Sequence, residues 1–226
     1  MPTLHLVRHG QASFGAADYD QLSELGARQC HALGRYYAER CMRFDAVLRG
    51  SLRRHQQSLA ALAEGYGELP PALEWPGLNE YDSEALIRAI HPAPLARPDT
   101  PEVYRAHFRL LRDALAAWMS GRTSPVGMPA YADWAAGIVG ALDHVRQHHG
   151  GQPDAQVLVM SSGGPISTAV GHVLGTAAEV TIELNFRIRN SSVTELAFTP
   201  KRHMLSTFNH VPHLDHPERS SWISYA

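Results

Sequence analysis

Three short clusters of residues carry side chains that could bind or transfer a phosphoryl group, and the first is Arg8-His9-Gly10. It ends an apolar run that begins at Thr3. A neutral imidazole can attack phosphorus and hold a phosphoryl group covalently, and an arginine beside it offers a planar set of donors suited to phosphate. We expect Gly10 to adopt a backbone conformation closed to other residues, so that His9 projects from the turn.

The second cluster lies at the start of a predicted helix, and the third lies in a proline-rich segment. Arg53 and Arg54 fall in a first helical turn, where free amides and the helix dipole also attract an anion. Glu80 is a loop carboxylic acid that could stay protonated beside an anion pocket and act as a general acid. Each cluster, taken alone, is equally compatible with an ordinary solvated turn or loop.

The elements that must position these side chains alternate along the chain. Short apolar runs at 3–7, 45–49, 157–160, 193–198 and 203–209 indicate strands, and helical spacing or caps indicate helices that begin near residues 23, 51, 100, 131 and 163. The proline-rich segment 68–99 is expected to be mainly loop. Strands that alternate with helices predict an α/β sheet covered on both faces, with ligands at the carboxyl ends of the strands.

Length and composition exclude several other classes of protein. The 226 residues fit one domain or one domain with an insertion, and the balance of 20 basic and 22 acidic residues creates no field that would attract nucleic acid or an anionic membrane. Two cysteines are too few for a disulfide scaffold. No apolar run suits a membrane-spanning helix, and residues 1–10 lack the features of a secretion signal. We therefore expect a cytoplasmic protein without nucleic-acid or membrane partners.

In this order and at these distances, the three clusters resemble the motifs of the histidine phosphatase (phosphoglycerate mutase-like) superfamily. Arg8-His9-Gly10 matches the arginine-histidine-glycine signature at the end of the first strand. Arg54 and Ser58 match an arginine followed four residues later by a small hydroxyl residue, and Leu78-Asn79-Glu80 matches the acid motif. The resemblance covers nearly the whole chain, from about Thr3 to Asn209.

The resemblance implies a fold, a reaction and a set of site residues. The fold is a three-layer α/β/α sandwich, a single domain over 1–226 with a helical lid inserted at about 82–129. The reaction is hydrolysis of a small phosphorylated substrate through a phosphohistidine, with inorganic phosphate as product and with no metal or cofactor. His9 is then the nucleophile and Glu80 the proton donor, and the phosphate is bound by Arg8, Arg54, Ser162 and Gly163.

The chain departs from the family at a fourth motif, Ser-His-Gly after a strand. Here the run is Met160-Ser161-Ser162-Gly163-Gly164-Pro165, so Ser162 stands at the position of the histidine that faces the phosphorylated one. A serine can donate one hydrogen bond but brings no positive charge, and losing a preorganised donor costs about 10²–10³-fold in rate. We expect that a histidine at residue 162 would find room and raise kcat by about tenfold or more.

Three other functions stay open. The pocket could belong to a non-catalytic, regulatory phospho-ligand binder, which Ser162 favours and the other matched motifs oppose. Phosphoglycerate mutase-type transfer is a second alternative, although the signature continues here as Gln11-Ala12-Ser13-Phe14, where the mutases have glutamate. A serine nucleophile at residue 162 would need a glycine two residues earlier, where the chain has Met160.

Two further clusters have simple structural interpretations. The histidines at the C-terminal end recur every three residues, but prolines interrupt them and neither acid nor cysteine frames a metal site; they are His210, His213 and His216. Three arginines share one face of the predicted helix that begins at Thr100, either as a basic lid for an anionic substrate or as a solvated helix face; they are Arg105, Arg109 and Arg112.

Overall fold

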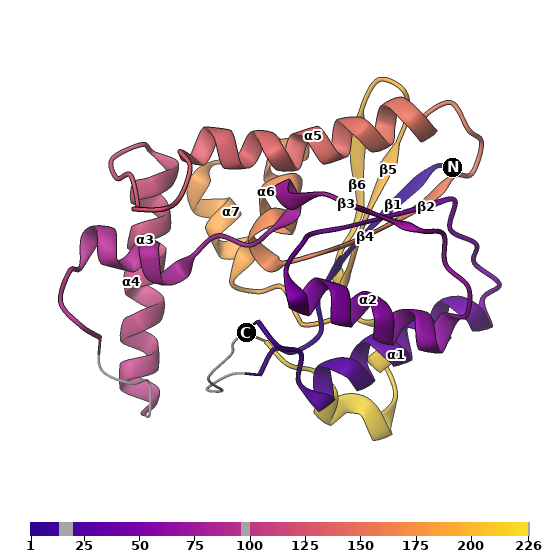
Figure 1. Cartoon of the computed structure of the whole chain (residues 1–226), viewed down its shortest axis with the longest axis horizontal. Coiled ribbons are helices and arrows are strands. Elements are labelled where there is room, and N and C mark those ends of the chain that lie inside the picture. Colours follow the sequence, from indigo (N-terminus) through magenta and orange to yellow (C-terminus); the bar gives the residue numbers. More distant parts are fainter. Residues whose placement is uncertain (14–19, 96–99, 226) are drawn as a thin grey trace.

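The computed structural model describes residues 1–13, 20–95 and 100–225 (Figure 1). Within these ranges six strands form one sheet in the order β3-β2-β4-β1-β5-β6. Strands β3, β2, β4 and β1 pair in parallel, and β5 runs antiparallel to both of its neighbours. The strands are β1 (Thr3–Arg8), β2 (Ala46–Arg49), β3 (Ala72–Glu74), β4 (Gln156–Ser161), β5 (Val193–Phe198) and β6 (His203–His210).

Helices cover both faces of this sheet (Figure 1). Successive side chains of a strand point to opposite faces, so Leu4 and Leu6 of β1 pack in one core cluster and Val7 packs in the other. The first cluster contains residues of α5 and α6, and the second contains residues of α1 and α2. This confirms the three-layer α/β/α sandwich. The helices are α1 (Glu24–Glu39), α2 (Arg53–Tyr66), α5 (Tyr131–His149) and α6 (Gly163–Leu174).

Three more helices stand to one side of the sheet (Figure 1). They are α3 (Ser83–Ile90), α4 (Pro101–Met119) and α7 (Ala178–Asn185). Their shared core contains Leu86, Leu115, Trp118 and Ile182. The first two occupy the segment expected to form a helical insertion, and α7 was not predicted at all.

The interpretation of 68–99 as mainly loop missed three short elements. Strand β3, a 3₁₀ turn at Pro76–Leu78 and helix α3 all lie within it. The three residues of β3 are exposed at the sheet edge, so the strand lacks the alternation of buried and exposed positions from which a strand is predicted. Helix α3 is capped by Asp82, whose side chain accepts the backbone N–H of Ala85 at 2.9 Å. The proline content therefore hid short elements that obey ordinary capping rules.

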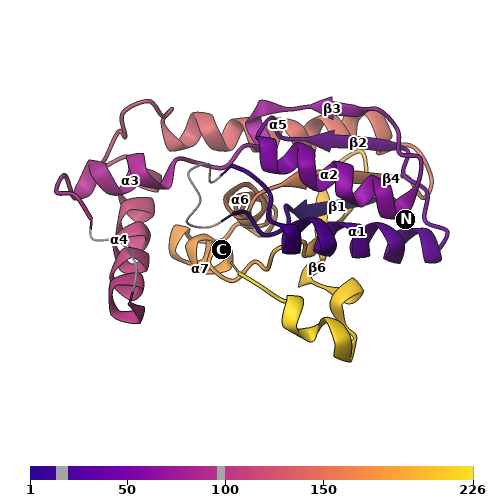
Figure 2. The same cartoon turned by 60° about the horizontal axis from the view of Figure 1, so that its bottom comes forward.

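The C-terminal segment returns to the first helix. Figure 2 shows it as two short 3₁₀ turns, Pro212–Leu214 and Pro217–Trp222, below β6 and α1. The amide of Gln29 in α1 donates to the carbonyl oxygen of Trp222 at 2.6 Å. Across the described residues, no helix combines the length and the apolar character needed to cross a membrane.

Candidate active site

The site begins where β1 and β4 end. Arg8 pairs with Ser161 in the register of the two strands, so His9 and Ser162 are the next residues at one edge of the sheet. From β1 the chain continues to α1 on one face, and from β4 it continues to α6 on the opposite face. Such a reversal opens a crevice at the strand ends, which is where open α/β sheets bind ligands.

His9 is buried at this edge, with 3% of its surface exposed. Its Nδ1 lies 2.6 Å from the carbonyl oxygen of Gly10. Because a carbonyl oxygen can only accept, the ring hydrogen is on Nδ1, and Nε2 keeps its lone pair. Burial, and then the charges of Arg8 and Arg54, lower the pKa of His9 well below its ordinary value of 6.5. The imidazole is therefore neutral at neutral pH, as a nucleophile must be.

Gly10 allows a close approach between the turn and helix α1. A Cβ atom on Gly10 would lie 2.3 Å from the carbonyl oxygen of Gly26. Four described glycines have a positive φ, and Gly10 is not among them. The expectation of a backbone conformation closed to other residues is therefore wrong. The N–H of Gly10 also donates to Ser58 Oγ at 3.1 Å, which ties the turn to α2.

Two arginines place positive charge around the imidazole. Arg8 and Arg54 are nearly buried, whereas Arg53 is exposed. The Nη1 of Arg8 donates to the carbonyl oxygen of Ile188. Since both buried guanidinium groups act on the pKa of His9, an anion that reached the imidazole would meet their charge.

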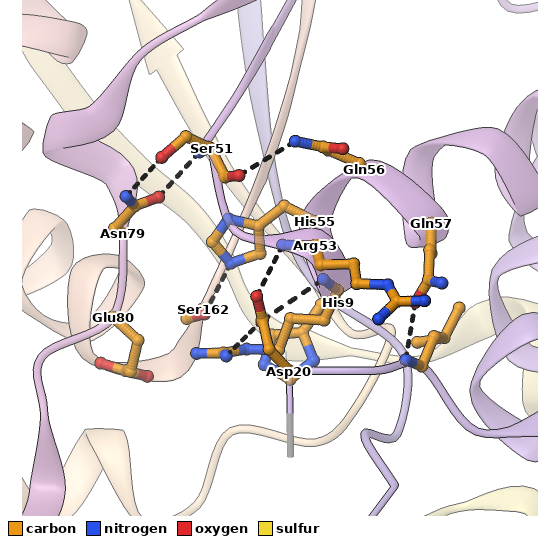
Figure 3. A network of polar contacts seen from close by, with 12 residues as sticks. His9, Asp20, Ser51, Arg53, His55, Gln56, Gln57, Asn79, Glu80 and Ser162 are labelled. Carbon is orange, nitrogen blue, oxygen red and sulfur yellow. Dashed lines mark hydrogen bonds and ion pairs between the residues drawn. The ribbon is translucent and has the colours of Figure 1, made fainter. Parts of the chain in front are cut away.

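The N-terminus of α2 is capped by Asp20 rather than by a neighbour in sequence. The helix begins at Arg53, near the start expected from the sequence, and its N-cap residue Leu52 makes no side-chain capping hydrogen bond. The carboxylate of Asp20 accepts the backbone N–H of Arg53 at 2.8 Å and that of Arg54 at 3.4 Å (Figure 3). It also accepts from Arg54 Nη1 at 2.7 Å. An anion from the chain itself thus sits on the donors that attract anions at a helix start.

Glu80 follows the 3₁₀ turn and lies on the far side of Ser162 from His9 (Figure 3). Its Oε2 accepts the backbone N–H of Gly164 at 3.1 Å, and its Oε1 accepts that of Tyr81 at 3.3 Å. Burial raises the pKa of Glu80, against the opposing effect of these bonds and of the nearby arginines. This carboxyl therefore keeps its proton at a pH where an ordinary glutamate has lost it.

Ser162 and Gly163 form the start of α6 between these groups. Ser162 is fully buried, and although it is the N-cap residue its side chain makes no capping hydrogen bond. Its Oγ lies 2.7 Å from Nε2 of His55 in α2 (Figure 3). The structure therefore lacks the room expected for an imidazole at residue 162. A Cβ atom on Gly163 would lie 3.9 Å from Arg8 Nε, so the amide end of α6 borders Arg8.

The structure brings all six predicted site residues together at the carboxyl ends of β1 and β4. It also places two further residues at the site that the sequence analysis missed. The additions are Asp20 and His55. Asp20 is 33 residues from the helix that it caps, which no local pattern could have shown. His55 stood within the matched arginine motif, directly after Arg54, and that placement was an available signal. Phe14, part of the comparison with mutases, lies outside the described residues.

The remaining histidine cluster has structural roles. His213 is buried, and its Nε2 lies 2.8 Å from Ser191 Oγ. His216 accepts the N–H of Glu218 on Nδ1 at 3.3 Å and so caps the last 3₁₀ turn. Over the described ranges, histidine, cysteine, aspartate and glutamate form no group of three that could hold a metal ion.

The basic face of α4 is a solvated surface for at least two of its three arginines. Arg105 pairs with Glu102, and Arg112 pairs with Glu183 of α7 at 2.7 Å. All four of these side chains are exposed, with 42% or more of each accessible. Their charges are therefore offset locally instead of being directed at an anion in the crevice.

A small cavity lined by aromatic side chains lies beside Glu80. It is lined by Tyr81, Trp118 and Trp134, whose ring centroids lie 5.3–6.2 Å apart, and by Gly164 and Asn185 among others. Asn185 donates from its side-chain amide to the Tyr81 hydroxyl at 2.6 Å. Because Gly164 lines the cavity and its N–H donates to Glu80, the cavity lies on the side of the site where Glu80 is.

Comparison with known proteins identifies the family. The model of the histidine phosphatase superfamily (branch 1) matches residues 4–211. The chain belongs to this superfamily. A sequence search of curated proteins finds no match.

Solved structures of the same fold match nearly the whole chain. A mycobacterial glucosyl-3-phosphoglycerate phosphatase in complex with inorganic phosphate is 22% identical, with a TM-score of 0.67, 95% of this chain covered and 100% of that one. A variant of the Entamoeba histolytica phosphoserine phosphatase, in complex with phosphoserine, is 18% identical, with a TM-score of 0.62, 95% of this chain covered and 100% of that one. These similarities establish the fold that the superfamily match also implies.

Proposed function

We propose that this chain is a phosphomonoesterase that transfers the phosphoryl group of a small substrate to His9 and then to water. The observation that carries the proposal is the 2.6 Å contact between His9 Nδ1 and the carbonyl oxygen of Gly10, which leaves the lone pair on Nε2 of a neutral ring. Phosphatases among the structural relatives, one bound to phosphate and one to phosphoserine, support the substrate class. Location in the cytoplasm stays a prediction.

In the first step, Nε2 of His9 bonds to phosphorus while the bond between phosphorus and the leaving oxygen breaks. The protonated carboxyl of Glu80 gives its proton to that oxygen, and its raised pKa keeps the proton available for this step. Arg8, Arg54 and the amide end of α6 stabilise the charge on the other phosphate oxygens. The intermediate is a phosphohistidine beside a glutamate carboxylate.

In the second step, the Glu80 carboxylate accepts a proton from a water molecule whose oxygen attacks the phosphorus. The bond between phosphorus and Nε2 of His9 breaks, inorganic phosphate leaves, and Glu80 is protonated again. Both residues end the cycle in their starting states.

We expect the leaving group of the substrate to lie on the side of the aromatic cavity. Glu80 must reach the leaving oxygen, and the same Gly164 that holds Glu80 lines the cavity. The ring of Tyr81, which is only partly buried, would therefore contact the part of the substrate that differs from one phosphomonoester to another. We expect esters with an apolar or aromatic leaving group to have lower KM values than small polar ones.

A non-catalytic phosphate binder is the second candidate. Two observations favour it: Ser162 in place of a histidine, and the ion pair that Arg54 already makes with Asp20 at 2.7 Å. Such a protein would bind phosphate in the same crevice without forming a bond to His9.

One experiment separates the two candidates. The full-length protein is assayed for phosphate release from a panel of phosphorylated metabolites and aryl phosphates, beside a His9→Ala variant whose phosphate affinity is measured by calorimetry. The phosphatase proposal predicts turnover by the wild type and its loss in the variant by about 10³-fold or more. Phosphate binding by a wild type that releases phosphate from no ester would support the binder instead.

A further inference from the structure

The side chain of His55 is buried against the catalytic edge of the sheet. His55 is the third residue of α2 and has no exposed surface. Its ring lies 5.8 Å from that of His9, centroid to centroid, and its Nε2 lies 2.7 Å from Ser162 Oγ (Figure 3). The proposed mechanism does not use this histidine, although it joins α2 to the start of α6.

Because of its contact with His55, Ser162 does not make the hydrogen bond that a serine at the N-cap of a helix usually makes. A serine at an N-cap normally accepts a hydrogen bond from an amide in the first turn of its helix. The Ser162 side chain accepts none and lies against His55 instead. The hydroxyl is therefore oriented by α2 rather than by α6.

The position of the hydrogen on the His55 ring follows from its two nitrogens. Burial, and then the charges of Arg54 and Arg49, lower the pKa of His55 to about 3, so the ring is neutral and carries one N–H. Among the described residues, Nδ1 is buried and has no hydrogen-bond partner. In either tautomer Nδ1 lacks a partner, as a donor if it carries the hydrogen and as an acceptor if it does not. Unpaired buried N–H groups are the rarer of the two, and a hydrogen on Nε2 has Ser162 Oγ as its acceptor, so the contact favours the Nε2–H tautomer.

We propose that His55 is a positioning residue that donates from Nε2 to Ser162 Oγ and thereby directs the single hydroxyl hydrogen of Ser162 to the bound phosphoryl group. The inference rests on the proposed function and extends it to a residue to which the matched motifs assign no role. With its oxygen accepting from His55, the serine can only donate to another acceptor. A donor fixed in advance stabilises the charge that develops on phosphate oxygens without a reorganisation cost.

The same contact could also suggest a serine nucleophile with His55 as its base. A ring whose pKa lies near 3 is a weak base at neutral pH, and among the described residues no acceptor orients its Nδ1. Activation of a serine needs a base near the operating pH and a third group that orients it. The arrangement of His55 and Ser162 therefore suits a Ser162 hydroxyl that donates to a ligand, and it does not suit removal of the hydroxyl proton by His55.

A double-mutant cycle tests the proposal. The variants are His55→Leu, Ser162→Ala, and both together, assayed with p-nitrophenyl phosphate, with thermal melts to confirm folding. Each single variant is expected to lower kcat by about 10- to 100-fold, and the double variant to lose no more than either. Losses that multiply in the double variant, or an unchanged kcat in a folded His55→Leu variant, would overturn it.

Two further measurements keep the proposal testable if His55→Leu folds poorly. The variant His55→Gln places an amide donor near the position of Nε2, so it should retain more activity than His55→Leu at the same thermal stability. A ¹⁵N NMR spectrum of the wild type with inorganic phosphate should show His55 protonated on Nε2. Protonation on Nδ1 alone, or a phosphoryl group trapped on Ser162, would contradict the proposal even in a protein that turns over no ester.

Failure of the proposed function has a different signature. The wild type would then hydrolyse no phosphomonoester and form no adduct on His9, while the NMR measurement would still report on His55 and Ser162.

Discussion

Glu80 Oε2 accepts the backbone N–H of Gly164 at 3.1 Å, which attaches the proposed proton donor to the first turn of α6. The two residues are 84 positions apart in the chain. A Cβ atom on Gly164 would lie 2.1 Å from Glu80 Oε1, so only glycine permits the contact. The acid and the amides that border the phosphate site are therefore held as one unit.

Replacing the acid should cost most for esters with poor leaving groups. Glu80→Gln keeps the shape of the side chain but has no proton to give to the leaving oxygen. We predict that kcat/KM, which reports the step in which the leaving group departs, falls by about 10²–10⁴-fold on an alkyl phosphate and falls less on p-nitrophenyl phosphate, whose leaving group needs less protonation. Steady-state kinetics with the two esters measure the difference.

The pH profile provides the control for this assignment. Because the pKa of Glu80 is raised by burial, its proton is present below that pKa and is lost as the pH rises through it. The wild type should therefore lose activity on the alkyl ester on the alkaline side, and this limb should be absent in Glu80→Gln. Equal losses on both esters with an unchanged profile would exclude Glu80 as the proton donor.

The two adjacent arginines of α2 should differ in their effect on phosphate binding. Arg54 is nearly buried beside His9, whereas Arg53 is exposed. Arg54→Ala should weaken inhibition by inorganic phosphate by about tenfold or more, the typical effect of losing a charged hydrogen bond. Arg53→Ala is the matched control and should change it by less than about twofold. A larger effect of Arg53→Ala would show that Arg53, and not Arg54, faces the phosphate.

Ser162→His should lower turnover, contrary to what the sequence alone suggests. The His55 ring already lies 2.7 Å from the Ser162 hydroxyl, so a second imidazole would overlap it. Removing that ring makes the space, and we expect the double variant His55→Ala/Ser162→His to exceed Ser162→His in kcat by about tenfold or more. A single Ser162→His variant that is folded and faster than the wild type would show that the two rings do not compete.

Much of the site could be predicted because its residues follow strands or begin helices. The turns after β1 and β4 are set by local sequence, and parallel pairing brings Arg8 and Ser161 into register at one edge. The resemblance to the family supplied the positions of Arg54 and Glu80. That the chain forms a single domain over 1–226 stays a prediction.

The parts that the sequence did not reveal depend on contacts between distant segments. His55 and Ser162 are 107 residues apart, and nothing in either segment alone indicates that their side chains meet. The role of Gly10 was misjudged for the same reason, since it depends on the approach of Gly26 from α1. Helix α7 and strand β3 are short, and β3 is exposed, so neither has the periodic burial that predicts an element.

The central claim is that His9 accepts the phosphoryl group, and trapping the intermediate tests it most directly. The protein is incubated with an aryl phosphate, quenched without acid, digested and examined by mass spectrometry beside the His9→Ala variant. We predict an acid-labile adduct of about 80 Da, one phosphoryl group, on the peptide that contains His9 and on no other. An adduct on Ser162, or rapid turnover by a folded His9→Ala variant, would contradict it.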